Sequence, residues 1–267
     1  REESQMLKLQ NITKTFNPGT VNEKVALSGI DLHLKPGDFA TIIGSNGAGK
    51  STMFNAICGD FMTDTGSITL AGEDVTFLPV HERARKIGRL FQDPMRGSAP
   101  GMTIEENLSL AAGHGGWFSS ISKADRNRFR EQLSLLSMGL EDRMKQPVGL
   151  LSGGQRQALT LMMATLDVPR LLLLDEHTAA LDPATAEKVL EITNNIVKEH
   201  KITTLMVTHN MQNALDMGNR VLMMDSGKIV LDIDEEAKKG LTVKDLLDMF
   251  REGAGKNLDN DRILLSQ

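Results

Sequence analysis

The sequence predicts an α/β fold built on a mostly parallel β-sheet with helices on its faces. Short apolar runs typical of buried strands occur at residues 39–44 (FATIIG), 170–175 (RLLLLD) and 203–209 (TTLMVTH), and segments with helical periodicity lie between them. Strands that alternate with helices in this way pair in parallel through helical crossovers. The 267 residues can bury a substantial core, as one large α/β domain or as two small ones.

The first part of the chain predicts mainly strands. Partial apolar alternation indicates half-buried strands at residues 6–16 and 30–34. The buried strand at residues 39–44 is followed by a glycine-rich turn and then by a helix over residues 51–58. Residues 66–72 (GSITLAG) predict another strand, because glycine turns bound it on both sides.

The middle of the chain predicts helices instead. From about residue 102 to about residue 163, apolar residues recur with mostly helical spacing. Within this stretch, residues 113–120 (GHGGWFSS) predict a flexible loop, because they are rich in glycine and serine. A helical segment inserted into an α/β frame is the simplest account of this pattern.

Strands and helices alternate again in the last third of the chain. Residues 183–200 predict a helix, for which Asp182 is a suitable N-cap. Residues 220–232 (RVLMMDSGKIVLD) predict a hairpin that turns at the Ser-Gly pair. A short helix is expected at residues 242–250, and the tail beyond it is polar.

Composition limits the kind of protein this can be. The net charge of −5 argues against general binding of duplex nucleic acid, which usually requires a basic surface. The single cysteine, Cys58, cannot form a disulfide within the chain, so we expect a packing role for it and a reducing compartment. No apolar run approaches the roughly 20 residues that span a bilayer and no signal peptide is visible, so a role at a membrane would require docking onto another protein. Because the chain opens with Arg1, we expect a processed or trimmed start, with Met6 as a natural initiator.

A phosphate-binding loop is predicted where the strand at residues 39–44 ends. The sequence GSNGAGKS fits the pattern G-x-x-x-x-G-K-[ST], and it lies between a predicted strand and a predicted helix, as that pattern requires. Its glycines let backbone N–H groups converge on phosphate oxygens, and the helix N-terminus adds positive partial charge. Lys50 can reach the β- and γ-phosphates of a nucleotide, and the Ser51 hydroxyl can bind Mg²⁺. The nucleotide-binding residues predicted here are Gly44, Ser45, Asn46, Gly47, Ala48, Gly49, Lys50, Ser51 and Thr52.

Two carboxylates follow the apolar run of the strand at residues 170–175. Beside a phosphate-binding loop, an acid at the end of a buried strand supplies a second magnesium ligand, so we expect Asp175 to hold Mg²⁺ through water. Glu176 comes next and points its side chain elsewhere. It is therefore placed to polarise an attacking water as a general base.

Three further motifs connect the chain with a known family. They are LSGGQ at residues 151–155, FQDP with Gln92, and VTH with His209. In this order, beside the phosphate-binding loop and LLLLDE, they resemble the ATP-binding subunit of ABC transporters from about Met6 to about Asp232. LSGGQ alone would be a weak match, whereas the ordered set is highly specific.

The resemblance implies a fold and its divisions. The fold is a P-loop NTPase core with a mostly parallel sheet, an N-terminal antiparallel β subdomain and an inserted α-helical signature subdomain. We expect one ABC ATPase domain over residues 1–267, with the helical subdomain at about 93–165 inserted in the RecA-like core and a C-terminal helical tail at about 233–267.

The resemblance also implies roles for single residues. Phe16 matches the aromatic residue that stacks on adenine, with an ordinary core position as the alternative. Gln92 matches a glutamine that contacts Mg²⁺ or water and senses the membrane partner, so the implied metal-binding set is Ser51, Gln92 and Asp175. His209 matches a histidine that contacts the γ-phosphate, and with Lys50 and Glu176 it makes up the implied catalytic set. The signature and the following aspartate add further ATP contacts: Ser152, Gly153, Gly154, Gln155 and Asp182.

His177 departs from the family's usual pattern, in which a proline follows the two acids. The chain reads DEHTAALDP where the common form resembles DEPTSALDP. A catalytic base is disfavoured because Glu176 and His209 already have that role by resemblance, and no paired His or Cys at ligand spacing supports a metal site. We expect His177 to pack or to form a hydrogen bond near this turn.

In this family two chains pack head to tail, so that each ATP lies between Lys50 of one chain and Ser152 of the other. The resemblance therefore implies a homodimer, or a heterodimer with a homologue, that ATP and Mg²⁺ close and hydrolysis opens. It also implies an ATPase that energises a separate integral membrane permease and is held by it at the cytoplasmic face of the membrane.

The DEHTAALDP variant looks like bacterial importer-type ATPases that work beside a small permease and an extracellular solute-binding protein. This indicates uptake of an amino acid or a similar small solute. An exporter and a soluble ABC ATPase, for example of the iron–sulfur assembly type, stay open as alternatives, and no nucleic-acid partner is expected. For permease docking near Gln92 we consider Met95, Met102 and Ile104, whose alternative role is ordinary core.

Overall fold

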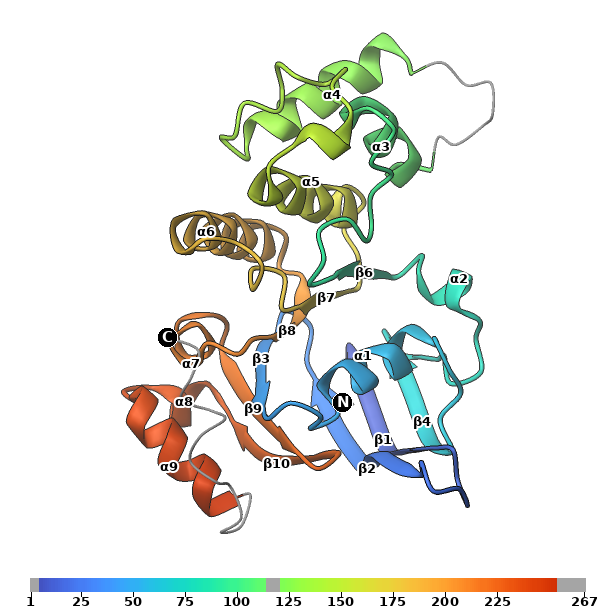
Figure 1. Cartoon of the computed structure of the whole chain (residues 1–267), viewed down its shortest axis with the longest axis vertical. Helices are drawn as coiled ribbons and strands as arrows, with labels where there is room; N and C mark the ends of the chain where they lie inside the picture. Colours follow the sequence, from blue (N-terminus) through green and yellow to red (C-terminus); the bar gives the residue numbers. More distant parts are fainter. Residues whose placement is uncertain (1–4, 114–120, 254–267) are drawn as a thin grey trace. The chain divides into compact units, whose positions relative to one another are not determined.

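A computed structural model describes residues 5–113 and 121–253 of the chain. These residues form two compact units. The sheet unit contains the chain up to residue 87, residues 170–173 and the chain from residue 201 onward, and the helical unit contains residues 88–169 and 174–200. Figure 1 shows the elements of both units, coloured along the sequence.

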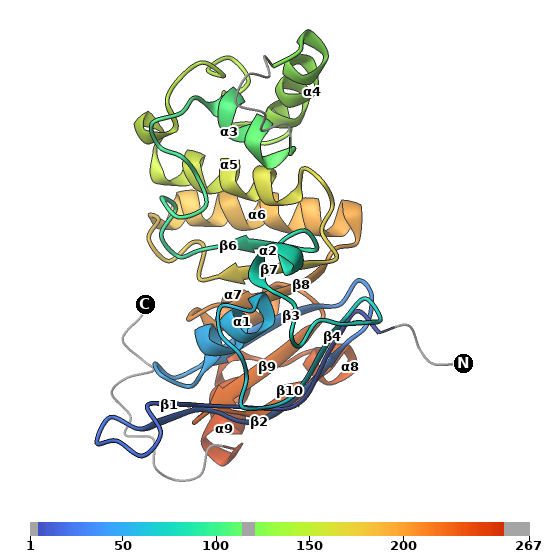
Figure 2. The ribbon, with the colours of Figure 1, turned by 90° about the vertical axis from the view of Figure 1, so that its right-hand side faces the viewer.

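The first sheet of the sheet unit is antiparallel. Its order is β2-β1-β4-β5, and its strands are β1 (Leu7–Phe16), β2 (Lys24–Leu34), β4 (Thr65–Leu70) and β5 (Glu73–Asp74). β1 pairs with β2 and with β4; the three strands lie side by side in Figure 1, and Figure 2 views their sheet nearly edge-on. This sheet is the antiparallel β subdomain that the family resemblance implied. β2 begins earlier than predicted, because a register shift against β1 and the left-handed Gly29 (φ 77°) break the apolar alternation.

The second sheet is mostly parallel, as predicted, and its order is β10-β9-β3-β8-β7-β6. Its strands are β3 (Phe39–Gly44), β6 (Ile87–Leu90), β7 (Leu171–Asp175), β8 (Thr203–Val207), β9 (Arg220–Asp225) and β10 (Lys228–Ile233). β3 pairs in parallel with β8 and β9, and β10 runs antiparallel to β9. β6 and β7 each begin in the sheet unit.

The interior of the second sheet explains why its strands read as unbroken apolar runs. The four leucines of β7 are completely buried, and the apolar residues of β3 and β8 are buried too. A strand covered on both faces has no exposed positions for polar residues. Phe54 and Ile57 of helix α1 (Lys50–Cys58) belong to the same apolar cluster, and the partly buried Cys58 packs against it.

The remaining helices of the sheet unit are short, apart from the last. They are α2 (Val80–Arg83), α7 (Met211–Asp216), α8 (Glu235–Lys238) and α9 (Val243–Gly253). α9 corresponds to the helix predicted at residues 242–250, and it buries Leu246 and Phe250 in a second apolar cluster with β9 and β10. The polar tail predicted after it lies outside the described residues.

The helical unit contains the helices that the middle of the sequence predicts. They are α3 (Ile104–Ala111), α4 (Lys123–Ser134), the 3₁₀ helix η1 (Val148–Leu150), α5 (Gly153–Thr165) and α6 (Pro183–His200). Side-chain caps begin most of them: Thr103 and Ser152 each form a reciprocal capping box, and Ser122 caps α4. Most of the loop predicted at residues 113–120 lies outside the described residues. Within the described ranges, no helix is long and apolar enough to cross a bilayer.

The three residues considered for permease docking differ in exposure. Met95 is 41% exposed and Met102 is half-buried, but Ile104 is completely buried at the start of α3. Ile104 is therefore a core residue of the helical unit, which was the alternative interpretation.

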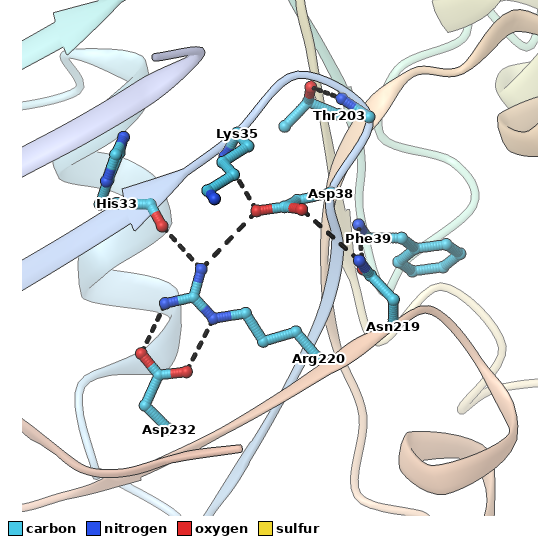
Figure 3. A network of polar contacts seen from close by, with 9 residues as sticks. His33, Lys35, Asp38, Phe39, Thr203, Asn219, Arg220 and Asp232 are labelled. Carbon is cyan, nitrogen blue, oxygen red and sulfur yellow. Dashed lines mark hydrogen bonds and ion pairs between the residues drawn. The ribbon is translucent and has the colours of Figure 1, made fainter. Parts of the chain in front are cut away.

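An arginine joins the two sheets where β3 begins, since Arg220 pairs with Ala40, and Figure 3 shows the contacts that it makes. Arg220, the first residue of β9, forms a bidentate ion pair with Asp232, with Nε–Oδ1 and Nη2–Oδ2 distances of 2.7 and 2.5 Å. Its Nη1 donates to the carbonyl of His33 on β2 at 2.6 Å and lies 3.7 Å from Asp38 Oδ2. The hydrogen bonds to Asp232 raise the pKa of Arg220. This network fixes where β3 enters the second sheet, since Asp38 directly precedes it.

Candidate nucleotide-binding site

The loop between β3 and α1 has a backbone that side chains would block at two positions. Gly44 has φ 156°, and a Cβ there would lie 2.2 Å from the Met224 carbonyl oxygen. Gly49 has φ 102°, and its Cβ would lie 2.7 Å from the Ala26 carbonyl oxygen. Both neighbours are backbone atoms that cannot move aside cheaply, so only glycine suits these positions.

The β9–β10 hairpin supports this loop. The hairpin turns at Ser226 (φ 48°) and Gly227 (φ 76°), as the sequence predicts. The Gly227 N–H donates to the Ala48 carbonyl at 2.9 Å, and the Ser45 hydroxyl lies 3.4 Å from Asp225 Oδ1. The shape of the loop therefore depends on a turn far away in the sequence.

Lys50 and the start of α1 place positive charge and backbone N–H groups close together. Lys50 is 5% exposed, and its Nζ donates to the carbonyls of Gly44 at 2.6 Å and Ser45 at 2.9 Å. No side chain caps α1, and its first turn has no acidic residue. The first N–H groups of the helix and its dipole therefore favour a negatively charged ligand at this point. Ser51 is exposed in the same turn.

Phe16 is not an ordinary core residue. It lies half-buried at the end of β1, with its ring edge-to-face with Phe61 at a centroid distance of 5.4 Å and an angle of 82°. Lys14 Nζ lies 5.7 Å from the Phe16 centroid and 5.4 Å from that of Phe61. Asp64 accepts a hydrogen bond from Lys14 at 3.0 Å, so the ammonium is held beside both rings. Phe16 is thus a partly exposed ring whose orientation is restrained by its neighbours.

His209 lies at the same edge of the sheet as the phosphate-binding loop. β3 and β8 are parallel neighbours, with Ile42 opposite Val207, and the Thr208 N–H donates to the Ile42 carbonyl at 3.1 Å. β3 leads into the loop at Gly44, and β8 leads into the exposed His209. The sheet unit therefore brings together three of the predicted features: the loop, Lys50 and His209.

The two carboxylates of the helical unit occupy different backbone environments. Asp175 is the last residue of β7, and its Oδ2 lies 3.7 Å from Nη2 of Arg89. Glu176 has φ 49°, a left-handed conformation that non-glycine residues seldom adopt. The chain turns sharply there, with the Ala179 N–H donating to the Glu176 carbonyl at 3.0 Å. Backbone strain of this kind concentrates at functional sites.

His177 is buried and neutral. It is 2% exposed, and its Nε2 lies 3.1 Å from the Thr193 hydroxyl on α6. That hydroxyl donates to the Val189 carbonyl at 2.8 Å, so its oxygen accepts from an Nε2–H group. Burial lowers the pKa of His177 to about 4. This is the packing environment that we expected, and it leaves His177 unsuited to act as a base on a water molecule.

The signature residues begin α5. The Ser152 hydroxyl accepts from the Gln155 N–H, and Gln155 Oε1 accepts from the Ser152 N–H, both at 3.2 Å. Ser152 is exposed, whereas Gly154 is buried against Thr185 at the start of α6. The Gln155 side chain is occupied in the cap, so its contact with ATP stays a prediction.

Asp182 is the N-cap of α6, as predicted: its Oδ1 accepts from the Thr185 N–H at 3.1 Å. The hydrogen bonds from Thr185 lower the pKa of Asp182. Gln92 is exposed just beyond β6. The helical unit thus holds Gln92, the signature, both carboxylates and Asp182. Sequence reasoning missed Arg89, Phe61 and Lys14, which belong to no motif and become visible only through their contacts.

Comparisons with known proteins agree on one family. Residues 27–179 match the family model described as ABC transporter. A tyrosine transport ATP-binding protein of Clostridioides difficile is 43% identical over 253 residues, which cover 92% of this chain and 98% of the relative. The methionine import ATP-binding protein MetN of Rhizobium johnstonii is 36% identical over 230 residues, which cover 85% of this chain and 60% of the relative.

Solved structures of ATP-binding cassettes share the fold. The cassette MJ0796, in a dimeric post-hydrolysis state bound to ADP and Pi, matches with a TM-score of 0.74 and 29% identity, covering 86% of this chain and 99% of that one. The protein cbiO1 of Clostridium perfringens, part of the ABC transporter complex cbiONQ, matches with a TM-score of 0.76 and 25% identity, covering 94% and 96%.

Proposed function

The chain belongs to the ABC transporter family as an ATP-binding subunit, and on that premise we propose that its system imports an amino acid, with tyrosine as the first solute to test. As a member of the family it binds and hydrolyses ATP, and it energises transport through a membrane permease. The observation that carries the choice of solute is the match to the tyrosine transport ATP-binding protein, which extends over 92% of this chain and 98% of the relative. The methionine import proteins among the relatives support the same class of solute.

We assign the phosphates of ATP to the corner formed by Lys50 and the start of α1. The Lys50 ammonium donates to the carbonyls of Gly44 and Ser45. When ATP arrives, charged β- and γ-phosphate oxygens replace these neutral acceptors, and charge-assisted hydrogen bonds are the stronger ones. Phe16 then stacks on the adenine. Stacking holds the nucleotide with little discrimination between bases.

We assign Mg²⁺ to Ser51, Gln92 and Asp175, which supply a hydroxyl, an amide and a carboxylate oxygen. These donors fit the ion, because Mg²⁺ prefers oxygen ligands and keeps several waters beside a few protein groups. When bound, it neutralises charge on the β- and γ-phosphates.

We assign the chemistry to Glu176 and His209. A water oxygen attacks the γ-phosphorus, the bond to the β-γ bridging oxygen breaks, and ADP leaves. Glu176 orients that water and takes its proton, and its left-handed backbone (φ 49°) is a conformation that concentrates at functional sites. His209 contacts the γ-phosphate from the edge of β8 and steadies the water and Glu176.

We also propose a head-to-tail dimer in which Ser152, Gly153 and Gly154 of one chain contact the γ-phosphate bound by the other. Gln155 and Asp182 stand next to that contact. The dimer of the related cassette MJ0796 supports this arrangement. The permease holds the dimer at the cytoplasmic face of the membrane, and an extracellular solute-binding protein delivers the solute.

The test starts with the partners. The chain, tagged in its host, is purified from membranes in mild detergent, and the permease and binding protein found with it are reconstituted in proteoliposomes. We expect uptake and ATP hydrolysis to rise with tyrosine and less with methionine or spermidine, solutes named for relatives. Stimulation by another solute alone would replace the tyrosine proposal. Recovery only from the soluble fraction, with assembly proteins attached, would overturn the transport assignment in favour of a soluble ABC ATPase.

A further inference from the structure

A cationic side chain lies directly beside the carboxylate that we assign to magnesium. Arg89, on β6, has its Nη2 atom 3.7 Å from Oδ2 of Asp175. The two side chains are only 13% and 14% exposed, so water screens their charges less than at the surface. The family motifs do not include Arg89, and the assignments above give it no role.

The position of Arg89 is set by an aromatic ring. Its guanidinium carbon lies 4.7 Å from the centroid of the Phe91 ring, and that of Arg96 lies 4.8 Å from the same centroid. A planar guanidinium stacks on an aromatic face and is held there by both dispersion and the ring quadrupole. Phe91 therefore serves as a platform for Arg89 and Arg96, directly before Gln92 in the sequence.

The platform itself is anchored. The Phe91 carbonyl accepts a hydrogen bond at 3.2 Å from Nε2 of Gln157, a residue that is 1% exposed on α5. α5 is the helix that Ser152 begins. Arg89 is thus held by a ring whose backbone is fixed to the signature helix, and its charge cannot drift away from Asp175 without breaking these contacts.

A fixed positive charge at this place changes what Asp175 does. It stabilises the charged form of the carboxylate, whose side chain is only 14% exposed, when no metal is nearby. It also repels a divalent cation that approaches the same carboxylate. The guanidinium groups of Arg89 and Arg96, which stack on the same ring, also repel each other. The negative charge of Asp175 offsets the positive charge of Arg89.

We propose that Arg89 is a positioning residue that holds the Asp175 carboxylate and competes electrostatically with Mg²⁺ for it, and that Phe91 keeps Arg89 in place. The inference rests on the proposed role of Asp175 in binding magnesium. Because Arg89 competes with the metal, the Mg²⁺–nucleotide complex binds less tightly than it would if the Asp175 carboxylate had no such neighbour. Product release is then not limited by the metal.

The test compares the affinity of the full chain for ATP in saturating Mg²⁺ with that in EDTA, by titration calorimetry. We expect Arg89→Gln to tighten binding in Mg²⁺ by about three- to tenfold, since a like charge beside the metal site has been removed. Binding in EDTA should stay within about twofold of wild type, because Lys50 and α1 hold the phosphates without the metal. Arg89→Lys keeps the charge but loses the planar stack on Phe91, so its affinity in Mg²⁺ should lie between those of wild type and Arg89→Gln.

Three further variants sharpen the comparison. Phe91→Leu removes the aromatic face but keeps an apolar side chain. It should tighten ATP binding in Mg²⁺, as Arg89→Gln does, but by a smaller factor. Arg130→Gln removes an exposed arginine of α4 and should change the affinity for ATP neither in Mg²⁺ nor in EDTA. This variant separates a local effect from a change in net charge. If Arg89→Gln does not fold, Arg89→Met serves in its place.

The outcomes distinguish the two proposals. If Arg89→Gln leaves the affinity for ATP in Mg²⁺ unchanged, or weakens it, while wild type binds ATP normally, the role of Arg89 alone is overturned. A wild-type chain that binds no nucleotide, or a Lys50→Ala variant with unchanged affinity in both arms, overturns the proposed nucleotide site instead.

Discussion

A Cβ atom at Gly154 would lie 2.1 Å from Cγ2 of Thr185. The first turn of α5 therefore approaches the first turn of α6 as closely as a glycine permits. The second glycine of the signature thus has a packing role within one chain, in addition to the phosphate contact that we propose across the dimer. The two roles can be separated experimentally, because the obstructing atom is a single methyl group.

Gly154→Ala should destabilise the chain by about 1–3 kcal/mol, the usual cost of inserting a methyl group into a packed contact. Thr185→Ser removes Cγ2, so the double variant should regain most of the lost melting temperature. Thermal unfolding and ATP hydrolysis are measured on the single and double variants. Recovery of stability without recovery of hydrolysis would support the phosphate contact, whereas a double variant that melts like Gly154→Ala would contradict the packing account.

His177 should make the stability of the chain dependent on pH. Burial lowers its pKa from 6.5 to about 4 in the folded state, so between these values the unfolded state binds a proton that the folded state does not. Stability due to neutral His177 is present above pH 6.5 and is lost as pH falls toward 4, by up to about 3 kcal/mol. Urea unfolding at a series of pH values should show this loss in wild type.

The matched variants for this effect are His177→Pro and His200→Asn. His177→Pro restores the residue of the common family pattern, and it should reduce the pH dependence and keep ATP hydrolysis within about tenfold of wild type, as a residue outside the chemistry would. His200 is exposed at the end of α6, so its substitution should leave the pH dependence intact. A larger loss of hydrolysis in His177→Pro would count against the packing role.

Glu176→Gln should nearly abolish hydrolysis and leave ATP binding intact. The amide is close to the size of the carboxylate but takes no proton from water, so ATP persists and holds the dimer closed. Light scattering with ATP and Mg²⁺ should then give the mass of a dimer, and addition of Lys50→Ala to the same chain should return it to a monomer. A Glu176→Gln chain that stays monomeric at saturating ATP would remove the main support for a shared site.

Several elements could be predicted because their signals are local. β7 is an unbroken leucine run because both of its faces are buried, and α6 has a cap that one aspartate supplies. The β9–β10 turn needs two left-handed residues, and Ser226-Gly227 fits that need. The phosphate-binding loop is equally local, because its chemistry depends on consecutive backbone N–H groups.

Other features could not be predicted because distant segments create them. α2 has four residues, too few to show a helical period. Its last residue, Arg83, is 1% exposed, and its guanidinium donates to carbonyls of Ala56, Ile57, Thr76 and Leu78. In the site, Arg89 has the same character: only the fold brings it to Asp175.

Phe16 and Phe61 should act together on the affinity for ATP. Phe16→Ala removes a stacking partner of adenine and should raise the KM by about 5- to 150-fold, corresponding to ~1–3 kcal/mol. Phe61→Ala removes the edge-to-face contact at 5.4 Å that orients the Phe16 ring, and it should raise the KM by less, with kcat nearly unchanged. Phe77→Ala is the matched control, since that ring is 79% exposed. Equal KM values for Phe61→Ala and Phe77→Ala would show that Phe61 does not orient Phe16.

Arg220→Met should lower the stability of the chain, because Arg220 links the two sheets of the sheet unit through Asp232 and the His33 carbonyl. Asp232 is 42% exposed, so solvent weakens that part, and we expect a loss of about 1–3 kcal/mol rather than the full cost of breaking a buried pair. Much of the loss comes from Asp38, which is left without its guanidinium neighbour at 3.7 Å. The double variant Arg220→Met/Asp38→Asn should therefore be more stable than Arg220→Met in urea unfolding. The network lies at the start of β3, away from the phosphate-binding loop at its end, so the affinity for ATP should stay unchanged in both variants. A loss of affinity in a variant that is fully folded would contradict a purely structural role.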